Sequence, residues 1–269
     1  MSSVCVGNDI VDLQSPRTEG RAADERFVAR VFAEPERRTI QAAAEPDLEL
    51  WCHWAAKEAG FKVISKLVGE PPPFVHRAFE VAWSEFEVAW SEAEEVVDHG
   101  GHAAPVRPDG GSVIRHGTVT WRERVAEVSV ALQLGAVHAV ASAVRARPAG
   151  FVRVLPRVAL LDAPESPWAG ALERLLPLFS AREVDAVYSR PSAAVRVGAR
   201  GDLAAQMGVA ESRLEIVCAP GPASQRPPRV LLDGEGTEAD VSLSHDGRLI
   251  AWAVWIGTTS QEGMHRDRP

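Results

Sequence analysis

Three charged residues lie close together in the stretch HWAAKEAGFK, residues 53–62. Glu58 and Lys62 are four positions apart, so in a helix they lie on one face, one turn from each other. A carboxylate there can bind a hard cation such as Mg²⁺ or accept a proton, and an ammonium group can neutralise phosphate oxygens. Lys57 adds a second ammonium group beside Glu58. The alternative for Glu58 and Lys62 is a plain helical salt bridge worth about 0.3–0.5 kcal/mol.

Apolar residues around this stretch predict the helix that carries it. They recur with a period of 3.6 from about Asp47 to Val68, with Gly69 and three prolines beyond the end. Lys57 projects from inside the apolar stripe, where a charge is costly unless it is paired or reaches water. The stripe that we expect to face a core consists of Leu50, Trp54, Phe61, Ile64 and Val68.

Two more polar residues stand at the ends of predicted strands. Asp9 lies in VGNDIVDL, which is typical of a strand ending near Asp12, and an aspartate there is usually a cap or turn residue. His245 lies in VSLSHDG, after an alternating strand pattern that contains Ser244. A single histidine there is usually a surface turn residue, and Asp246-Gly247 is predicted to form the hairpin turn.

The remaining pattern predicts strands and helices in two successive runs. Two short helices broken at Pro35 precede the long helix, and a turn-rich loop and antiparallel strands follow it. The stretch FEVAWSE occurs twice, at 79–85 and 86–92; we expect a strand for the first copy, although a helix also fits. The later predictions are strands at 118–125, 126–144, 151–164, 212–221 and 227–234, helices at 167–187 and 189–209, and a closing hairpin at 239–256.

The second run repeats the first on a large scale. Setting Gly69 against Gly208 aligns the ends of the two long helices, and the two closing hairpins align as well. We therefore expect an α+β protein of two similar halves, residues 1–147 and 148–269, which pack face to face as an intramolecular pseudodimer.

Composition limits the possible classes of function. The net charge of −8 argues against a general nucleic-acid binder, and no run of eighteen apolar residues could span a membrane. The beginning of the chain lacks a basic segment and an apolar signal core. Three scattered cysteines (Cys5, Cys52 and Cys218) suit reduced thiols. These features predict a cytoplasmic protein.

The motifs together resemble those of the 4′-phosphopantetheinyl transferases. VGNDIVDL, RFVARVF and WAAKEAGFK follow one another as in the small holo-acyl-carrier-protein synthase group, whose short chains form trimers. The length and the duplication resemble the two-half, surfactin-synthetase-activating group, whose active site lies between the halves. The order of the motifs is reversed here, because the acidic motifs precede the terminal VSLSHDG.

The resemblance implies a role for each matching residue. Asp9 and Glu58 would bind Mg²⁺, and Glu58 would also help to deprotonate the attacking serine. Lys62 would contact the phosphates of coenzyme A, and Ser244 and His245 would contact them from the opposing half.

Two further positions belong to these motifs. Lys57 belongs to the same motif, with either a phosphate contact or a structural pairing as its role. Position 11 is a valine, where the two-half group usually has a third acidic ligand. Val11 is similar to the small-enzyme pattern, in which water completes the coordination.

The implied reaction transfers the phosphopantetheine arm of coenzyme A to a serine of an apo carrier protein and releases adenosine 3′,5′-bisphosphate. The carrier could serve fatty-acid, polyketide or nonribosomal-peptide synthesis. Arg26, Arg30 and Arg37 lie on one helical face by their spacing and match the helix that binds the carrier; a solvated face is the alternative.

The repeat predicts a monomer with a single active site between its two halves. Each half keeps one contribution and lacks the other, because the aligned pairs are Glu58 with Val197, Lys62 with Gly201, Ser244 with Ala131 and His245 with Leu132.

Two other classes of function remain open. One is an inactive module that only binds carrier proteins, and the other is a different Mg²⁺-dependent phosphotransferase, although no Walker A loop is present.

Overall fold

The computed structural model describes residues 4–69, 71–84, 114–145, 154–218 and 226–257. In the first part of the chain a strand is followed by helices and then by four strands. Their bounds are β1 Val4–Asp12, α1 Glu25–Val31, α2 Glu34–Ala42, α3 Pro46–Val68, β2 Glu80–Trp83, β3 Ile114–Trp121, β4 Arg124–Gln133 and β5 Ala136–Val144, with short 3₁₀ helices η1 Pro16–Thr18, η2 Arg21–Ala23 and η3 His76–Ala78.

The second part of the chain has the same kinds of element. One strand precedes short helices, a long helix follows, and strands close the chain. Their bounds are β6 Val154–Leu160, α4 Leu172–Leu175, η4 Leu176–Leu178, α5 Ala181–Val184, α6 Arg190–Met207, η5 Glu211–Arg213, β7 Leu214–Cys218, β8 Pro228–Leu232, β9 Glu235–Gly236, β10 Asp240–Asp246 and β11 Leu249–Trp255.

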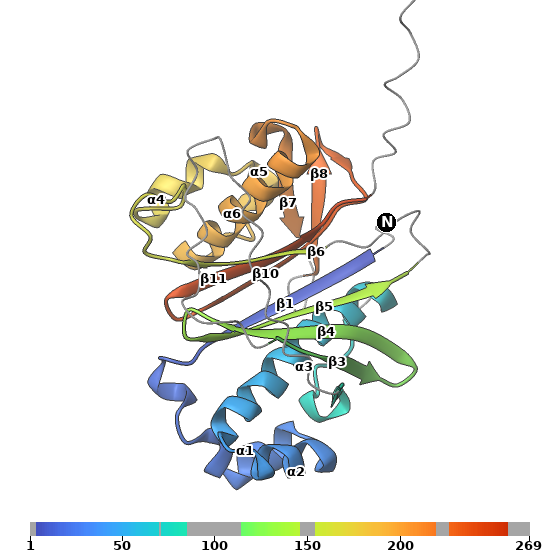
Figure 1. The fold of residues 1–269 in the computed structure, drawn as a ribbon. Helices are drawn as coiled ribbons and strands as arrows, with labels where there is room; N and C mark the ends of the chain where they lie inside the picture. The colour runs from blue at the N-terminus through green and yellow to red at the C-terminus, as the bar shows by residue number, and fades with distance from the viewer. Residues whose placement is uncertain (1–3, 70, 85–113, 146–153, 219–225, 258–269) are drawn as a thin grey trace, which may run out of the picture.

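These elements form an α+β protein with two sheets between two layers of helices (Figure 1). The first sheet is antiparallel, in the order β1-β5-β4-β3-β2, and the second has the order β10-β11-β6. Helix α3 covers the outer face of the first sheet, and α6 covers that of the second. A third small sheet, β7-β8-β9, lies beside α6.

The main core lies between α3 and the first sheet, and small residues bring the two close together. Ala55, Ala56 and Ala59 are completely buried, and a Cβ on Gly7 of β1 would collide with the carbonyl oxygen of Ala59. The predicted stripe of large residues is therefore wrong in part. Leu50 and Ile64 are fully buried, whereas Trp54, Phe61 and Val68 are only half-buried.

Most other predicted elements are present with changed bounds. The first FEVAWSE copy contains β2, and the second copy lies outside the described residues, as does most of the predicted hinge at 145–150. The helix predicted over 167–187 is a series of short helices, α4, η4 and α5. The closing hairpin turns at Gly247-Arg248 instead of Asp246-Gly247, because Asp246 still pairs with Leu249.

Two further observations concern the cysteines and the membrane. All three cysteines are free thiols. In the part of the chain that the structure describes, no helix combines the length and the apolar character needed to cross a bilayer.

Candidate active site

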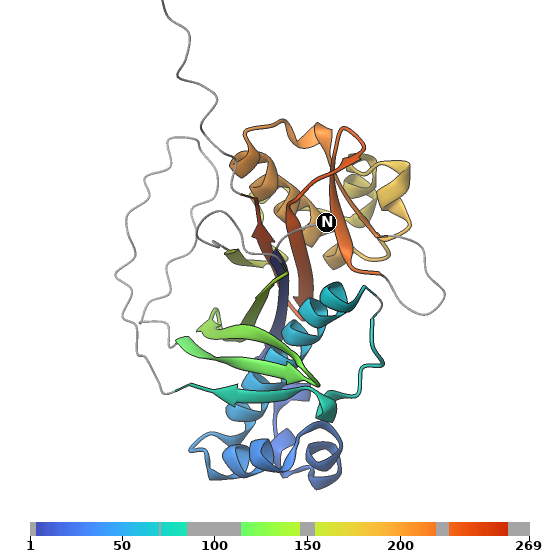
Figure 2. The ribbon, with the colours of Figure 1, turned by 90° about the vertical axis from the view of Figure 1, so that its right-hand side faces the viewer.

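The two sheets meet where their edge strands, β1 and β10, run side by side (Figures 1 and 2). We call the line of contact between these strands the seam. Side chains of β10 accept hydrogen bonds from the amides of β1, always between residues 234 positions apart, so the strands are parallel and in fixed register. The four bonds run from Val6 to Asp240, Asn8 to Ser242, Ile10 to Ser244 and Asp12 to Asp246, at 2.7–3.2 Å.

Asp9 lies in the middle of this seam. Its Oδ1 accepts hydrogen bonds from the hydroxyl of Ser244 at 3.0 Å and from the ammonium of Lys62 at 3.2 Å. Burial raises the pKa of Asp9 to about 6; the charge of Lys62 opposes this shift, and the negative charge of Glu58 adds to it. Asp9 and Glu58 are therefore two carboxylates close enough for the charge of one to disfavour ionisation of the other.

Lys62 links β1 and β10 at the same point. Besides Asp9, its ammonium contacts the carbonyl oxygens of Asn8 at 2.6 Å and of Leu243 at 3.5 Å. Its side chain is still 28% exposed, so the charge is not sealed from solvent. A phosphate contact for Lys62 stays a prediction.

A cleft of about 490 Å³ opens at this end of the seam. It brings together the predicted residues Asp9, Glu58 and His245, which come from β1, α3 and β10. Guanidinium groups and aromatic rings complete the wall. These additional lining residues are Arg17, Arg21, Arg30, Phe27, Trp51, Trp54, Ile10, Val11 and Asp246.

Glu58 projects into the cleft from α3 and has a defined neighbour. Its Oε1 lies 3.4 Å from Nε2 of His76, and the ring of His76 packs against Trp54 with a centroid distance of 4.5 Å. The side chain of Glu58 is 22% exposed and lines the cleft. Glu58 can therefore bind a cation or accept a proton there.

His245 contributes to the cleft from β10. Burial lowers its pKa, the nearby ammonium of Lys62 lowers the pKa further, and Asp246 opposes both effects. The adjacent Ser244 is buried, and its hydroxyl donates to Asp9 and accepts from the Ile10 amide. A direct contact of the Ser244 hydroxyl with a phosphate would need one of these bonds to open.

The structure argues against a phosphate contact for Lys57, one of the two roles that the motif left open. Lys57 is completely buried, and its ammonium bonds to Glu36 Oε2 at 2.7 Å and to the carbonyl oxygens of His76 and Phe79. It lies among α2, α3 and η3, away from the lining of the cleft. Of the two roles open to Lys57, this geometry supports structural pairing.

The predicted arginine face is also changed. Arg26 and Arg30 lie on α1, but the chain leaves the helix at Phe32, and Arg37 lies on α2. Arg37 forms an ion pair with Glu34 of its own helix. The three residues therefore do not share the face of one helix, and of the three only Arg30 lines the cleft.

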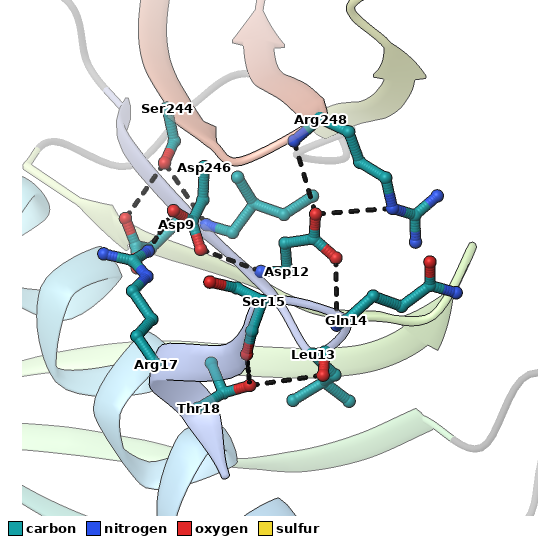
Figure 3. A network of polar contacts seen from close by, with 11 residues as sticks. Asp9, Asp12, Leu13, Gln14, Ser15, Arg17, Thr18, Ser244, Asp246 and Arg248 are labelled. Carbon is teal, nitrogen blue, oxygen red and sulfur yellow. Dashed lines mark hydrogen bonds and ion pairs between the residues drawn. The ribbon is translucent and has the colours of Figure 1, made fainter.

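Sequence reasoning missed Arg17 and the network around it (Figure 3). Arg17 forms an ion pair with Asp246 across the seam, and both residues line the cleft. Asp12 beside it accepts from the amide of Gln14 at 3.1 Å and lies 3.3 Å from Nε of Arg248. Because a contact between residues 229 positions apart leaves no local pattern, the motif search could not find Arg17.

Comparison with known proteins gives a family match over the part of the chain that carries the acidic motifs. Residues 5–102 match the family model of the 4′-phosphopantetheinyl transferase superfamily. The resemblance of the motifs is thereby confirmed over this part of the chain.

Two relatives show how far the similarity extends. Holo-acyl-carrier-protein synthase of Shewanella frigidimarina is 32% identical over 76 residues, which cover 28% of this chain and 60% of that protein. The crystal structure of the Thermotoga maritima holo-acyl-carrier-protein synthase matches 65% of this chain and 74% of that chain, with 15% identity and a TM-score of 0.31. The chain thus spans about three fifths of the curated relative.

The raised pKa of Asp9 predicts a testable pH dependence of stability. Between pH 3.8 and about 6 the folded protein holds a proton that the unfolded chain releases, so the free energy of unfolding falls as pH rises through this window. Asp9→Asn removes the ionised group and should stabilise the protein near neutral pH by on the order of 1–3 kcal/mol, but not near pH 4. Urea unfolding at several pH values measures this; an equal loss of stability at every pH would contradict it.

Proposed function

We propose that the protein transfers the 4′-phosphopantetheine arm of coenzyme A to a serine of an apo acyl or peptidyl carrier protein, in a Mg²⁺-dependent reaction. The observation that carries the proposal is the meeting of Asp9, Glu58 and His245 in one cleft, beside three arginines. The superfamily match over residues 5–102 supports the same reaction class.

The donor set at the cleft fits a magnesium ion. Asp9 and Glu58 offer carboxylate oxygens, which Mg²⁺ prefers, and burial together with the charge of Glu58 disfavours the ionised form of Asp9 in spite of Lys62, so a bound cation would stabilise that form further. When bound, Mg²⁺ stabilises the negative charge on the oxygens of the reacting pyrophosphate. Glu58 would also accept the proton of the carrier serine, directly or through water.

The cationic groups of the cleft fit the anionic substrate. Arg17, Arg21 and Arg30 line it, and guanidinium groups bind phosphate oxygens in pairs. His245 and Lys62 would bind phosphates from the two sides of the seam. Arg26 would remain on the surface of α1 for the acidic carrier. In this proposal Arg30 binds the substrate in the cleft and does not belong to the carrier-binding surface.

A buried glutamate network that occurs in both parts of the chain supports the two-half pseudodimer. Glu36 accepts the amide of Ala33 at the start of α2 and the amide of Val81 in β2, and pairs with Lys57. In the second part Glu183 does the same: it accepts the amides of Ser180 and Ile216 and lies 3.6 Å from Arg200 of α6. Such a repeated network is expected from an ancestral duplication.

We predict a monomer with one coenzyme A site per chain. At the aligned positions of the first part of the chain, Ala131 and Leu132 stand in the places of Ser244 and His245, so a second seam would lack the Ser-His pair. Calorimetric titration with light scattering should give one site per monomer. His245→Ala should weaken coenzyme A binding about tenfold or more, whereas the control Leu132→Val should not. A trimer, or two equal sites, would contradict the prediction.

The test of the function is incubation with coenzyme A, Mg²⁺ and a panel of apo carrier proteins from fatty-acid, polyketide and nonribosomal-peptide synthesis. We expect at least one carrier to gain the mass of one phosphopantetheine. Tight carrier binding without any mass gain would favour the alternative, a transferase-like module that only binds carriers. A cytoplasmic location is part of this proposal, because the reaction needs coenzyme A.

A further inference from the structure

Lys66 lies on the same face of α3 as Glu58, two helical turns further along and away from the cleft. Its side chain is only 7% exposed. The ammonium donates to the carbonyl oxygen of Val6 on β1 and to that of Val241 on β10, both at 2.7 Å. Lys66 therefore holds both edge strands of the seam with one charged group.

Asp240 completes this contact. Its Oδ2 lies 2.9 Å from the ammonium of Lys66 and also accepts the amide of Val6 at 2.7 Å. Asp240 is nearly as buried as Lys66, so each charge depends on the other. The pair stands at the first residue of β10, at the far end of the seam from His245.

One turn nearer the cleft, Lys62 repeats the contact of Lys66, reaching the carbonyl oxygens of Asn8 and Leu243. The next turn of α3 carries Glu58, which lies in the cleft with His245. Four residues along α3 thus cover about the same distance as two residues along β1 and β10. The position of β10 along β1 decides which of its residues stands opposite Glu58.

The central part of the seam does not define this position by itself. Ser242 and Ser244 make equivalent bonds to β1, so a shift of β10 by two residues would still place a serine at the amide of Asn8 or of Ile10. Such a shift would move His245 by roughly 7 Å along the seam. A charged pair at the end can distinguish the two registers, because Asp240 matches Lys66 in only one of them.

We infer that Lys66 and Asp240 are positioning residues, which fix the register of β10 against β1 and so keep Ser244 beside Asp9 and His245 in the cleft. Neither residue lines the cleft. The effect on coenzyme A rests on the proposed function, whereas the effect on the register does not.

The test compares Lys66→Met and Asp240→Asn with the wild type by amide hydrogen exchange and by coenzyme A titration. The substitution Asp240→Asn keeps the shape of the side chain and an acceptor for the Val6 amide, so this variant serves if Lys66→Met does not fold. The control is Asp202→Asn, because Asp202 binds Trp252 and Arg157 in the second half, away from the seam.

We expect the Ile10 amide to exchange at least about tenfold faster in both seam variants, with the buried Ile216 amide unchanged. Coenzyme A affinity should fall by a similar factor, and the control should change neither quantity. Unchanged exchange at Ile10, equal acceleration at Ile216, or faster exchange with unaltered coenzyme A affinity would each overturn the inference. If the wild type binds no coenzyme A, the proposed function fails, and exchange at Ile10 still decides the register.

Discussion

Replacing Glu58 with glutamine should lower the turnover of carrier modification at least about 100-fold, with little change in folding. Glutamine keeps the size of the side chain and can still contact His76. It cannot carry the negative charge that would bind Mg²⁺, and it is a very poor proton acceptor. Initial rates at saturating coenzyme A and carrier, over a range of Mg²⁺ concentrations, measure the effect.

Two matched variants sharpen this prediction. Asp9→Asn should cause a loss of similar size, because the proposed metal site would again be one carboxylate short. Glu49→Gln serves as the control, since Glu49 lies on the same helix but pairs with Arg115 and does not line the cleft. Near-normal rates at low Mg²⁺ in both site variants would reject the assignment of the active site.

Lys57→Met should destabilise the protein by about 3–5 kcal/mol, because the carboxylate of Glu36 would remain buried without its cation. The same variant should leave the coenzyme A affinity of the folded protein nearly unchanged, since Lys57 lies outside the cleft. Urea unfolding measures the first quantity, and calorimetric titration below the unfolding transition measures the second.

The double variant Lys57→Met/Glu36→Gln tests the cause of this loss. Removing both charges should restore part of the stability, because no unpaired charge is left. Glutamine also retains an acceptor for the amide of Ala33. The opposite pattern, normal stability with much weaker coenzyme A binding in Lys57→Met, would contradict the structural role and support a phosphate contact for Lys57.

The sequence predicted the elements of the site better than the contacts between them. The helix bounds and the strand that contains Asp9 follow from local periodicity, which a single chain segment can show. The burial of Lys57 was also predictable from its place inside an apolar stripe. Its partner was not, because Glu36 lies on a separate helix, 21 residues earlier.

The seam shows the same limit more strongly. Its bonds join residues 234 positions apart, and the alternation in VSLSHDG predicts a strand without saying that its serines meet the amides of β1. The stripe on α3 was misjudged for a related reason. Aromatic side chains dominate a hydrophobic pattern, whereas the closest packing against β1 uses Ala59 opposite Gly7.

The most direct test of the account is a crystal structure of the protein with coenzyme A and Mn²⁺ as a detectable substitute for Mg²⁺. We predict one metal ion, bound by the carboxylates of Asp9 and Glu58. The pyrophosphate of coenzyme A should lie in the same cleft, with His245 on its other side. Coenzyme A bound elsewhere, or a metal ion that touches neither carboxylate, would contradict the central claim that the seam is the active site.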